Sequence, residues 1–346
     1  MTRRAPTREA AAFILSALAA LVTVGCGASG PRPMAEPVPY YRYPDIPGQN
    51  NLRLISMLTD PAAGRFAQGT AAPAEGPVER TIMKPVAVAS AADHTVFVLD
   101  YGRGRIYRMT YGLNGELRGN SMLPRSGRVF PSAVDLEVTP AGDLWVVDSR
   151  LKSVFVISPN GDIIDSISSG FERPVGIAYH PLQQRMLVAD LAGNAIVTFD
   201  LAAHHVATHN AGTGLRLEAP SYLAVGPEGR IYVVEALSAR VRVFNSDWDS
   251  VGTFGGIGDG PGYFARPKGV VVDADSRIYV ADALFDNVQI FREDGELLLT
   301  LGSTGSGLGE FWQPTGLALD SQERVYVADA FNRRVQVFGW EEAADR

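Results

Sequence analysis

The chain has 346 residues, of which 46% are hydrophobic and 20% are charged, the composition of an ordinary soluble domain. Its formal net charge is −7, and the first 25 residues carry three Arg and one Glu, so the chain after them has a net charge of −9. Because contacts to phosphates need a basic face, this acidic balance argues against a nucleic-acid-binding protein.

The first 25 residues have the pattern of an export signal. Arg3, Arg4 and Arg8 precede an apolar run from Ala10 to Val24, which is short for a membrane span but fits the core of a signal peptide. The run is followed by Cys26, the only cysteine of the chain, so no internal disulfide can form. We therefore expect residues 1–25 to be a signal peptide.

A lone cysteine at this place resembles the lipid-attachment site of bacterial lipoproteins, although Thr23 stands where that family prefers a larger aliphatic residue. The resemblance implies that Cys26 carries a lipid that holds the protein in the cell envelope. Gly27 stands where many inner-membrane lipoproteins have an aspartate, so the resemblance also implies the outer membrane. The alternative is conventional cleavage near Ala28, which would remove Cys26.

Residues 26–50 are rich in proline and glycine and show no apolar period, which predicts a semi-rigid tether. The segment Leu52–Leu58 then alternates apolar and other residues as a single β-strand does, but it has no hairpin partner nearby. We therefore expect this strand to pair with a sheet elsewhere in the chain.

A repeated unit occurs six times between Lys84 and Phe338. The last two copies each read as Pro-x-Gly, an alternating apolar run, a turn, Tyr-Val-Ala-Asp, a polar loop and a second alternating run, and the first four follow this pattern less closely. Alternation with period two and hairpin turns such as Asn160-Gly161 favour antiparallel strands, and repeats of this length are typical of propeller blades. The sequence therefore predicts an all-β fold, a six-bladed β-propeller of four-stranded antiparallel blades. The leading prolines are Pro85, Pro131, Pro174, Pro220, Pro267 and Pro314, separated by 46, 43, 46, 47 and 47 residues.

The sixth copy lacks a fourth strand, because only eight residues follow Phe338. We expect Leu52–Leu58 to complete this blade, which would close the ring and remove exposed sheet edges. The predicted domains are a signal peptide (1–25), a lipid-attachment site and tether (26–50), the propeller (51–340) and a C-terminal tail (341–346).

The repeated unit resembles the NHL repeat. The resemblance rests on the Pro-x-Gly, Tyr-Val-Ala-Asp and Arg-Val-Gln-Val-Phe segments, covers Lys84 to Phe338 and is strongest in the last two copies. The loop pattern of the family, Asp-x-x-Asn-x-Arg-Val, is kept at Asp329, Asn332 and Arg334. The resemblance implies a six-bladed propeller whose loops form a recognition surface.

Loops after the second and fourth strands of a blade emerge on one face of the ring, which we call the loop face. Aromatic and basic residues gather in these loops, as they do in binding hot spots. The bases before three leading prolines are expected near the axis, where they can receive a carboxylate or phosphate unless neighbouring acidic residues pair with them. The opposite face, the hairpin face, is expected to offer little for binding. The predicted ligand-face residues are Lys84, Tyr101, Arg103, Arg150, Arg173, Arg266, Phe285, Trp312, Phe331 and Arg333.

An acidic residue ends the second strand of every copy. Its recurrence indicates a structural role, because a carboxylate can accept hydrogen bonds from backbone N–H groups of the adjoining loop. The series consists of Asp100, Asp148, Asp190, Glu235, Asp282 and Asp329.

Two residues interrupt the columns of small residues expected around the central channel. Asp135 stands where the other copies have Ala or Val, and a buried carboxylate must be hydrogen-bonded, paired or protonated. Tyr222 stands where the others have Ala or Gly, and it is expected to plug the channel or to present its hydroxyl to a ligand. Both are channel candidates.

The sequence contains no nucleophile elbow, phosphate loop, dinucleotide fingerprint or zinc-site spacing, and we assign no cofactor, metal or catalytic residue. By analogy with other repeat folds we expect a monomeric, lipid-anchored binding module for an envelope protein, a peptide or a glycan. The alternative is a metal-dependent enzyme resembling the lyases and lactonases built on six-bladed propellers, with its site in the central channel.

Overall fold

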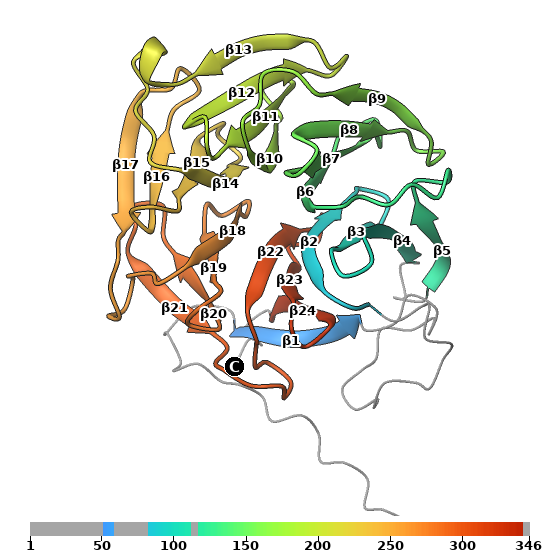
Figure 1. The fold of residues 1–346 in the computed structure, drawn as a ribbon. Coiled ribbons are helices and arrows are strands. Elements are labelled where there is room, and N and C mark those ends of the chain that lie inside the picture. The colour runs from blue at the N-terminus through green and yellow to red at the C-terminus, as the bar shows by residue number, and fades with distance from the viewer. Residues whose placement is uncertain (1–50, 59–81, 112–116, 342–346) are drawn as a thin grey trace, which may run out of the picture. The chain divides into compact units, whose positions relative to one another are not determined.

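The computed structural model describes residues 51–58, 82–111 and 117–341. The expectations about the signal peptide, Cys26, the tether and most of the tail lie outside these residues. Six separate four-stranded antiparallel sheets stand around a common axis, so the predicted six-bladed propeller is confirmed (Figure 1). One short 3-10 helix, η2 (Ala211–Thr213), follows the third blade. In the described part of the chain we find no helix with the length and apolar character that a membrane crossing needs.

The first three blades are each built from four consecutive strands, ordered from the axis outward. Blade 1 contains β2 (Pro85–Ser90), β3 (Thr95–Asp100), β4 (Arg105–Tyr111) and β5 (Leu117–Leu123). Blade 2 contains β6 (Ala133–Val138), β7 (Leu144–Asp148), β8 (Ser153–Ile157) and β9 (Ile163–Ile167). Blade 3 contains β10 (Pro174–His180), β11 (Arg185–Asp190), β12 (Ala195–Asp200) and β13 (His205–His209).

The next two blades follow the same order, and the sixth takes its outer strand from the other end of the described chain. Blade 4 contains β14 (Pro220–Val225), β15 (Ile231–Glu235), β16 (Arg240–Phe244) and β17 (Ser250–Gly255). Blade 5 contains β18 (Pro267–Val272), β19 (Ile278–Asp282), β20 (Asn287–Phe291) and β21 (Leu297–Leu301). Blade 6 contains β22 (Pro314–Leu319), β23 (Val325–Asp329), β24 (Arg334–Glu341) and β1 (Asn51–Leu58).

The pairing of β1 with β24 confirms the expected closure of the ring. The two strands are antiparallel, with Leu52 opposite Trp340 and Leu58 opposite Val335. Leu58 also packs in an apolar cluster that joins blade 6 to blade 1. The outer edge of blade 6, which the sixth copy would leave exposed, is thus paired through backbone hydrogen bonds with β1.

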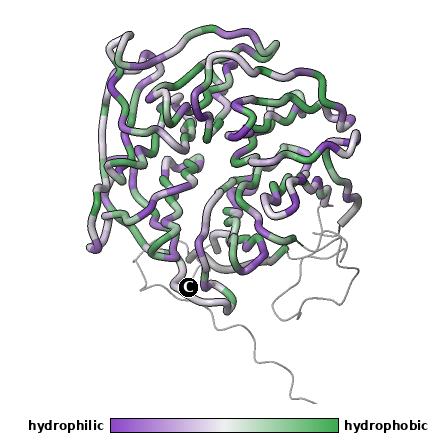
Figure 2. The backbone as a smooth tube through the Cα atoms, viewed as in Figure 1, coloured by the Kyte–Doolittle hydropathy of each residue, from purple (hydrophilic) through white to green (hydrophobic). Residues whose placement is uncertain are grey.

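The hydrophobic core is divided into six clusters, one between each pair of neighbouring blades. Each middle strand has two apolar faces because it packs against a blade on either side, so the whole of β7, β15, β19 and β23 is buried. Outer strands such as β9 are exposed over three of their five residues. Polar residues accordingly follow much of the outer rim of the ring (Figure 2).

The inner strands are irregular where they begin, at the loop face. In blade 5 the pairing with the second strand shifts between Pro267 and Val270, and the other five blades show a similar shift. Inner strands of neighbouring blades also come very close here, since a Cβ on Gly269 would lie 2.5 Å from the carbonyl oxygen of Thr315. Glycine in the Pro-x-Gly pattern is therefore required by the close approach of adjacent backbones.

Candidate functional site

The acidic series holds the loops of the loop face in place, as predicted. All six carboxylates are buried. Asp282 makes the most complete set of these bonds. Before the inner strand it accepts hydrogen bonds from the backbone N–H groups of Ala265 and Arg266. After the second strand it accepts them from those of Leu284 and Phe285. Asp100 accepts comparable bonds from Met83, Lys84 and Gly102, among the equivalent bonds of the other blades.

These bonds bring positively charged side chains together at the loop-face end of the axis. A cavity of about 170 Å³ is lined there by Lys84, Arg266 and Lys268, and we call it the basic mouth. Among the described residues, no carboxylate forms an ion pair with any of these three cations or with Arg173. The interpretation that the axial bases pair with the acidic series is therefore wrong, because those carboxylates bind backbone amides, and in two blades arginines of the third strand.

Aromatic rings form one wall of the basic mouth. The Nζ of Lys84 lies 5.5 Å from the ring centre of Tyr101 and 4.9 Å from that of Phe331, both within cation–π range. Trp312 packs against Phe331 with ring centres 5.5 Å apart and ring planes inclined by 31°. Tyr101, Phe331 and Trp312 are 42%, 42% and 51% exposed. This wall can therefore receive a flat or apolar part of a ligand whose acidic group enters the mouth.

Sequence reasoning missed Lys268, which lies in the inner strand β18 and lines the mouth. Burial, together with the charges of Arg266 and Arg173, lowers the pKa of its amine from 10.5 to about 8. Its Nζ lies 5.7 Å from the ring centre of Tyr222. The signal was present in the repeat, because Lys268 is the only charged residue between the leading proline and the position of the glycine. The equivalent residues in the strand pairing are Val86, Val134, Val175, Ser221 and Thr315.

The ligand-face residues predicted from the sequence do not all meet at this cavity. Lys84, Tyr101, Arg266 and Phe331 line it, and Trp312 contacts it through Phe331. The others belong to loop-face segments but do not line the mouth: Arg103, Arg150, Arg173, Phe285 and Arg333.

Tyr222 separates the basic mouth from a second chamber further along the axis. It lines both cavities, and the second has a volume of about 270 Å³ and is enclosed by all six inner strands. Burial and the charge of Asp135 raise the pKa of the Tyr222 hydroxyl, so the residue stays neutral. The side chain thus takes the place expected of a channel plug.

The second chamber is acidic. Asp135 and Glu137 project from β6 into it, and we call it the acidic chamber. Asp135 accepts hydrogen bonds from the N–H groups of Ile177 and Leu136, both at 3.0 Å, and Glu137 accepts one from Val138 at 3.1 Å. Burial outweighs these bonds and raises the pKa of Asp135 to about 7, and burial with the nearby Asp135 raises that of Glu137 to about 8.

Within the described ranges, no group of three or more His, Cys, Asp or Glu side chains is arranged to hold a metal ion. The second carboxylate, Glu137, was not singled out from the sequence because it sits in an alternating run where polar residues are ordinary.

A family model described as a 6-bladed beta-propeller matches residues 269–343. None of the curated proteins compared with the chain matches its sequence.

Solved structures of the same fold include enzymes. Virginiamycin B lyase from Staphylococcus aureus is 13% identical with a TM-score of 0.57, over 84% of this chain and 99% of that chain. A gluconolactonase from Xanthomonas campestris is 13% identical with a TM-score of 0.58, over 85% and 90%. A protein of unknown function from Bacteroides thetaiotaomicron is 15% identical with a TM-score of 0.61, over 85% and 76%. Similarity at these identities shows the six-bladed fold.

Proposed function

We propose that this chain is an exported, lipid-anchored propeller that binds an acidic protein, peptide or glycan at the basic mouth. The observation that carries the proposal is the group of three cations, Lys84, Arg266 and Lys268, around one cavity without a described carboxylate partner. Like charges held close together repel one another, and burial disfavours the charged form of Lys268. A bound anion would relieve both effects, so the mouth is electrostatically suited to an acidic group.

The size of the cavity limits what enters it. A volume of about 170 Å³ accepts a single acidic group with a few attached atoms. The remainder of the ligand would lie over the exposed rings of Tyr101, Phe331 and Trp312, while Gln313 and Thr315 offer hydrogen-bonding groups at the rim. A peptide with a glutamate or a free carboxyl end, or a glycan with a sugar acid, has both parts.

The binding test uses fluorescence anisotropy with labelled hexaglutamate and labelled oligogalacturonate, which represent the peptide and the glycan. We expect Arg266→Glu and Lys268→Gln each to weaken binding of the preferred probe by about tenfold or more, since a charged hydrogen bond contributes about 1.5 to 3 kcal/mol. The matched control is Arg292→Glu, which changes an exposed arginine on the hairpin face. Equal affinity of the mouth variants and the wild type for both probes would refute the proposal.

The first described strand begins at the hairpin face, where Asn51 pairs with Glu341. We propose that Cys26, which lies outside the described residues, carries the lipid anchor. We expect Cys26→Ala to release the protein from the membrane fraction, and an unmodified mature amino terminus beyond Cys26 would contradict the anchor.

An enzyme with its site in the channel is the second candidate. The observation that favours it is the pair of carboxylates, Asp135 and Glu137, in the acidic chamber, because perturbed acids cluster at functional sites. Metal analysis of the purified protein tests it. A stoichiometric metal that is lost in Asp135→Asn would favour the enzyme over the binding module.

A further inference from the structure

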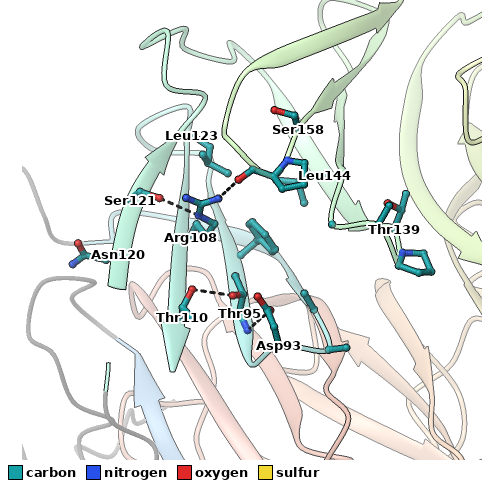
Figure 3. A pocket seen from close by; sticks show the side chains of 17 residues that line it. Asp93, Thr95, Arg108, Thr110, Asn120, Ser121, Leu123, Thr139, Leu144 and Ser158 are labelled. Carbon is teal, nitrogen blue, oxygen red and sulfur yellow. Dashed lines mark hydrogen bonds between the residues drawn. The ribbon is translucent and has the colours of Figure 1, made fainter. Parts of the chain in front are cut away.

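A larger pocket lies on the hairpin face, away from both axial cavities. It has a volume of about 500 Å³ and opens between blade 1 and blade 2 (Figure 3). We call it the interblade pocket. None of its lining residues lines the basic mouth or the acidic chamber. It arises from the packing of two adjacent blades, not from a long loop.

The same position is filled in the last two blades. In blade 5 the turn residue Asp273 binds Arg277 at 2.6 Å and accepts a hydrogen bond from the hydroxyl of Tyr279 at 2.8 Å. Blade 6 repeats this network with Asp320, Arg324 and Tyr326. In blade 1 the corresponding residues of the repeat are Ala91, Thr95 and Phe97, all of which line the pocket. The pocket thus lies where blade 1 has Ala91 and Thr95 in place of the ion pair and Phe97 in place of the tyrosine.

Arg108 is a charged residue in an otherwise uncharged column. It stands opposite Phe97 on β4. Its guanidinium donates from Nε to the Ser121 hydroxyl at 3.1 Å and from Nη1 to the carbonyl oxygen of Pro159 in blade 2. Among the described residues it has no carboxylate partner. The equivalent residues of blades 2 to 6 are Val156, Thr198, Val243, Ile290 and Val337.

The rest of the lining is rich in uncharged hydrogen-bonding groups. Thr95 and Thr110 bond each other at 2.9 Å on one side of the pocket, and Ser121, Thr139 and Ser158 add further hydroxyls. Asp93 also lines the pocket, and one of its oxygens accepts the N–H of Thr95. Arg108 is the only basic residue in the lining and can pair with one carboxylate of a ligand, whereas a second negative charge would find no cation and would be repelled by Asp93.

We propose that the interblade pocket binds a small hydroxylated monocarboxylate, such as a sugar acid. The carboxylate of the ligand pairs with the remaining N–H groups of Arg108, and its hydroxyls exchange hydrogen bonds with the threonine and serine side chains and with Asp93. The site is independent of the proposed function at the basic mouth, because the two cavities share no residue.

Isothermal titration calorimetry of the full chain with D-glucuronate, D-glucose and acetate tests the proposal. We expect glucuronate to bind at least about tenfold more tightly than glucose or acetate, because only glucuronate provides both the charge and the hydroxyls. Arg108→Val should remove that difference. The variant should fold, because valine is the residue of blades 2, 4 and 6 at this position.

Two further variants separate this pocket from the basic mouth. Lys268→Gln weakens any binding of glucuronate at the basic mouth, so in this background the preference for glucuronate should persist and should be lost when Arg108→Val is added, whereas Asp93→Asn should keep or strengthen it. Failure of the wild type to bind glucuronate, equal binding by Arg108→Val, or loss of binding in Lys268→Gln but not in Arg108→Val would each overturn the proposal. The last result would assign glucuronate to the mouth and so would not count against the proposed function.

Discussion

The two ends of the axial channel carry ionisable side chains of opposite type, basic at one end and acidic at the other. At the loop face, Arg266 and Lys268 line a mouth in which no described carboxylate pairs with them. At the other end, Asp135 and Glu137 line a chamber whose lining includes no basic residue among those described. Tyr222 lies between the two cavities and lines both of them.

Because all blades copy one unit, this difference comes from substitutions at repeated positions. Lys268 replaces Val, Ser or Thr residues of the other copies. In the strand pairing, Asp135 stands where blades 1 and 3 have Ala87 and Gly176, and Glu137 stands where they have Ala89 and Ala178, so the sequence alignment of blade 2 was two residues out of register. Uncompensated charge near the axis costs stability, because the attraction that would offset desolvation is missing. The backbone of the ring thus supplies a neutral channel, and a few substitutions give each end its own chemistry.

Asp282→Ala is expected to have the largest effect. It should disrupt the basic mouth and leave the acidic chamber intact. The substitution leaves the backbone N–H groups of Ala265, Arg266, Leu284 and Phe285 without their acceptor. We expect a loss of about 4 kcal/mol in the free energy of unfolding, measured by urea denaturation, because each unsatisfied buried donor costs about 1 to 3 kcal/mol. Probe binding at the mouth should be lost with it.

Asp282→Asn is the matched control, since it keeps one acceptor oxygen. We expect it to lose about half as much stability as Asp282→Ala. Equal stability of Asp282→Ala and the wild type would show that the carboxylate does not hold the loops of the mouth.

The second prediction uses pH to distinguish the two ends. In the folded chain the pKa values of Asp135 and Glu137 are raised to about 7 and about 8, from 3.8 and 4.5. Between those values the folded state binds more protons than the unfolded state, so stability falls as the pH rises. We expect the free energy of unfolding to fall by an amount on the order of 3 kcal/mol between about pH 5 and about pH 8. This fall is smaller than the one that fully buried carboxylates would give, because both groups face the channel.

Lys268 changes the pH dependence of stability in the opposite direction. Its pKa is lowered from 10.5 to about 8, so above about pH 8 the unfolded state binds more protons and stability rises again, on the order of 1 kcal/mol. Urea denaturation across this range should show a minimum near about pH 8. Asp135→Asn with Glu137→Gln should remove the fall and keep the rise, and a profile unaffected by that double variant would be inconsistent with the acidic chamber.

The third prediction removes the barrier between the two ends. Tyr222→Gly restores the residue that blades 3, 5 and 6 have at this position. We expect a cost of about 2 kcal/mol in unfolding free energy, below the range for a fully buried aromatic ring because Tyr222 is half-buried. Water entering from the mouth should lower the pKa of Asp135 toward its ordinary value and flatten the pH dependence.

Tyr222→Phe separates the ring from its hydroxyl. The hydroxyl has no hydrogen-bond partner among the described residues, so this variant should match the wild type within about 0.5 kcal/mol. A steep pH dependence that persists in Tyr222→Gly would show that the ring does not isolate the chamber.

The fold could be predicted from the sequence because the same pattern of strands and turns occurs in six copies. A proline lies at or just before the start of each inner strand, the acidic series marks each second strand, and the missing strand of the sixth copy identifies Leu52–Leu58 as its partner. These features depend on local residue patterns and on closure of the ring, and both can be recognised from the sequence alone.

The sites were harder to predict, because they depend on which side chains neighbouring blades bring together. Lys268 sits in a variable position, and only its approach to Arg266 and Tyr222 gives it importance. The interblade pocket was not expected, because a face of tight hairpins offers few loop residues. It results from small residues in blade 1 meeting Thr139 and Pro159 of blade 2, which no single repeat reveals.

The most direct test of the account is the titration of Lys268 by NMR, with ¹³C-dimethylated lysines and Lys268→Gln to assign the signal. We predict a pKa near about 8 in the free protein and a rise of about one unit or more when labelled hexaglutamate or oligogalacturonate is added, because a bound carboxylate favours the charged amine. An ordinary pKa of 10.5 that neither ligand changes would contradict a basic mouth that binds anions.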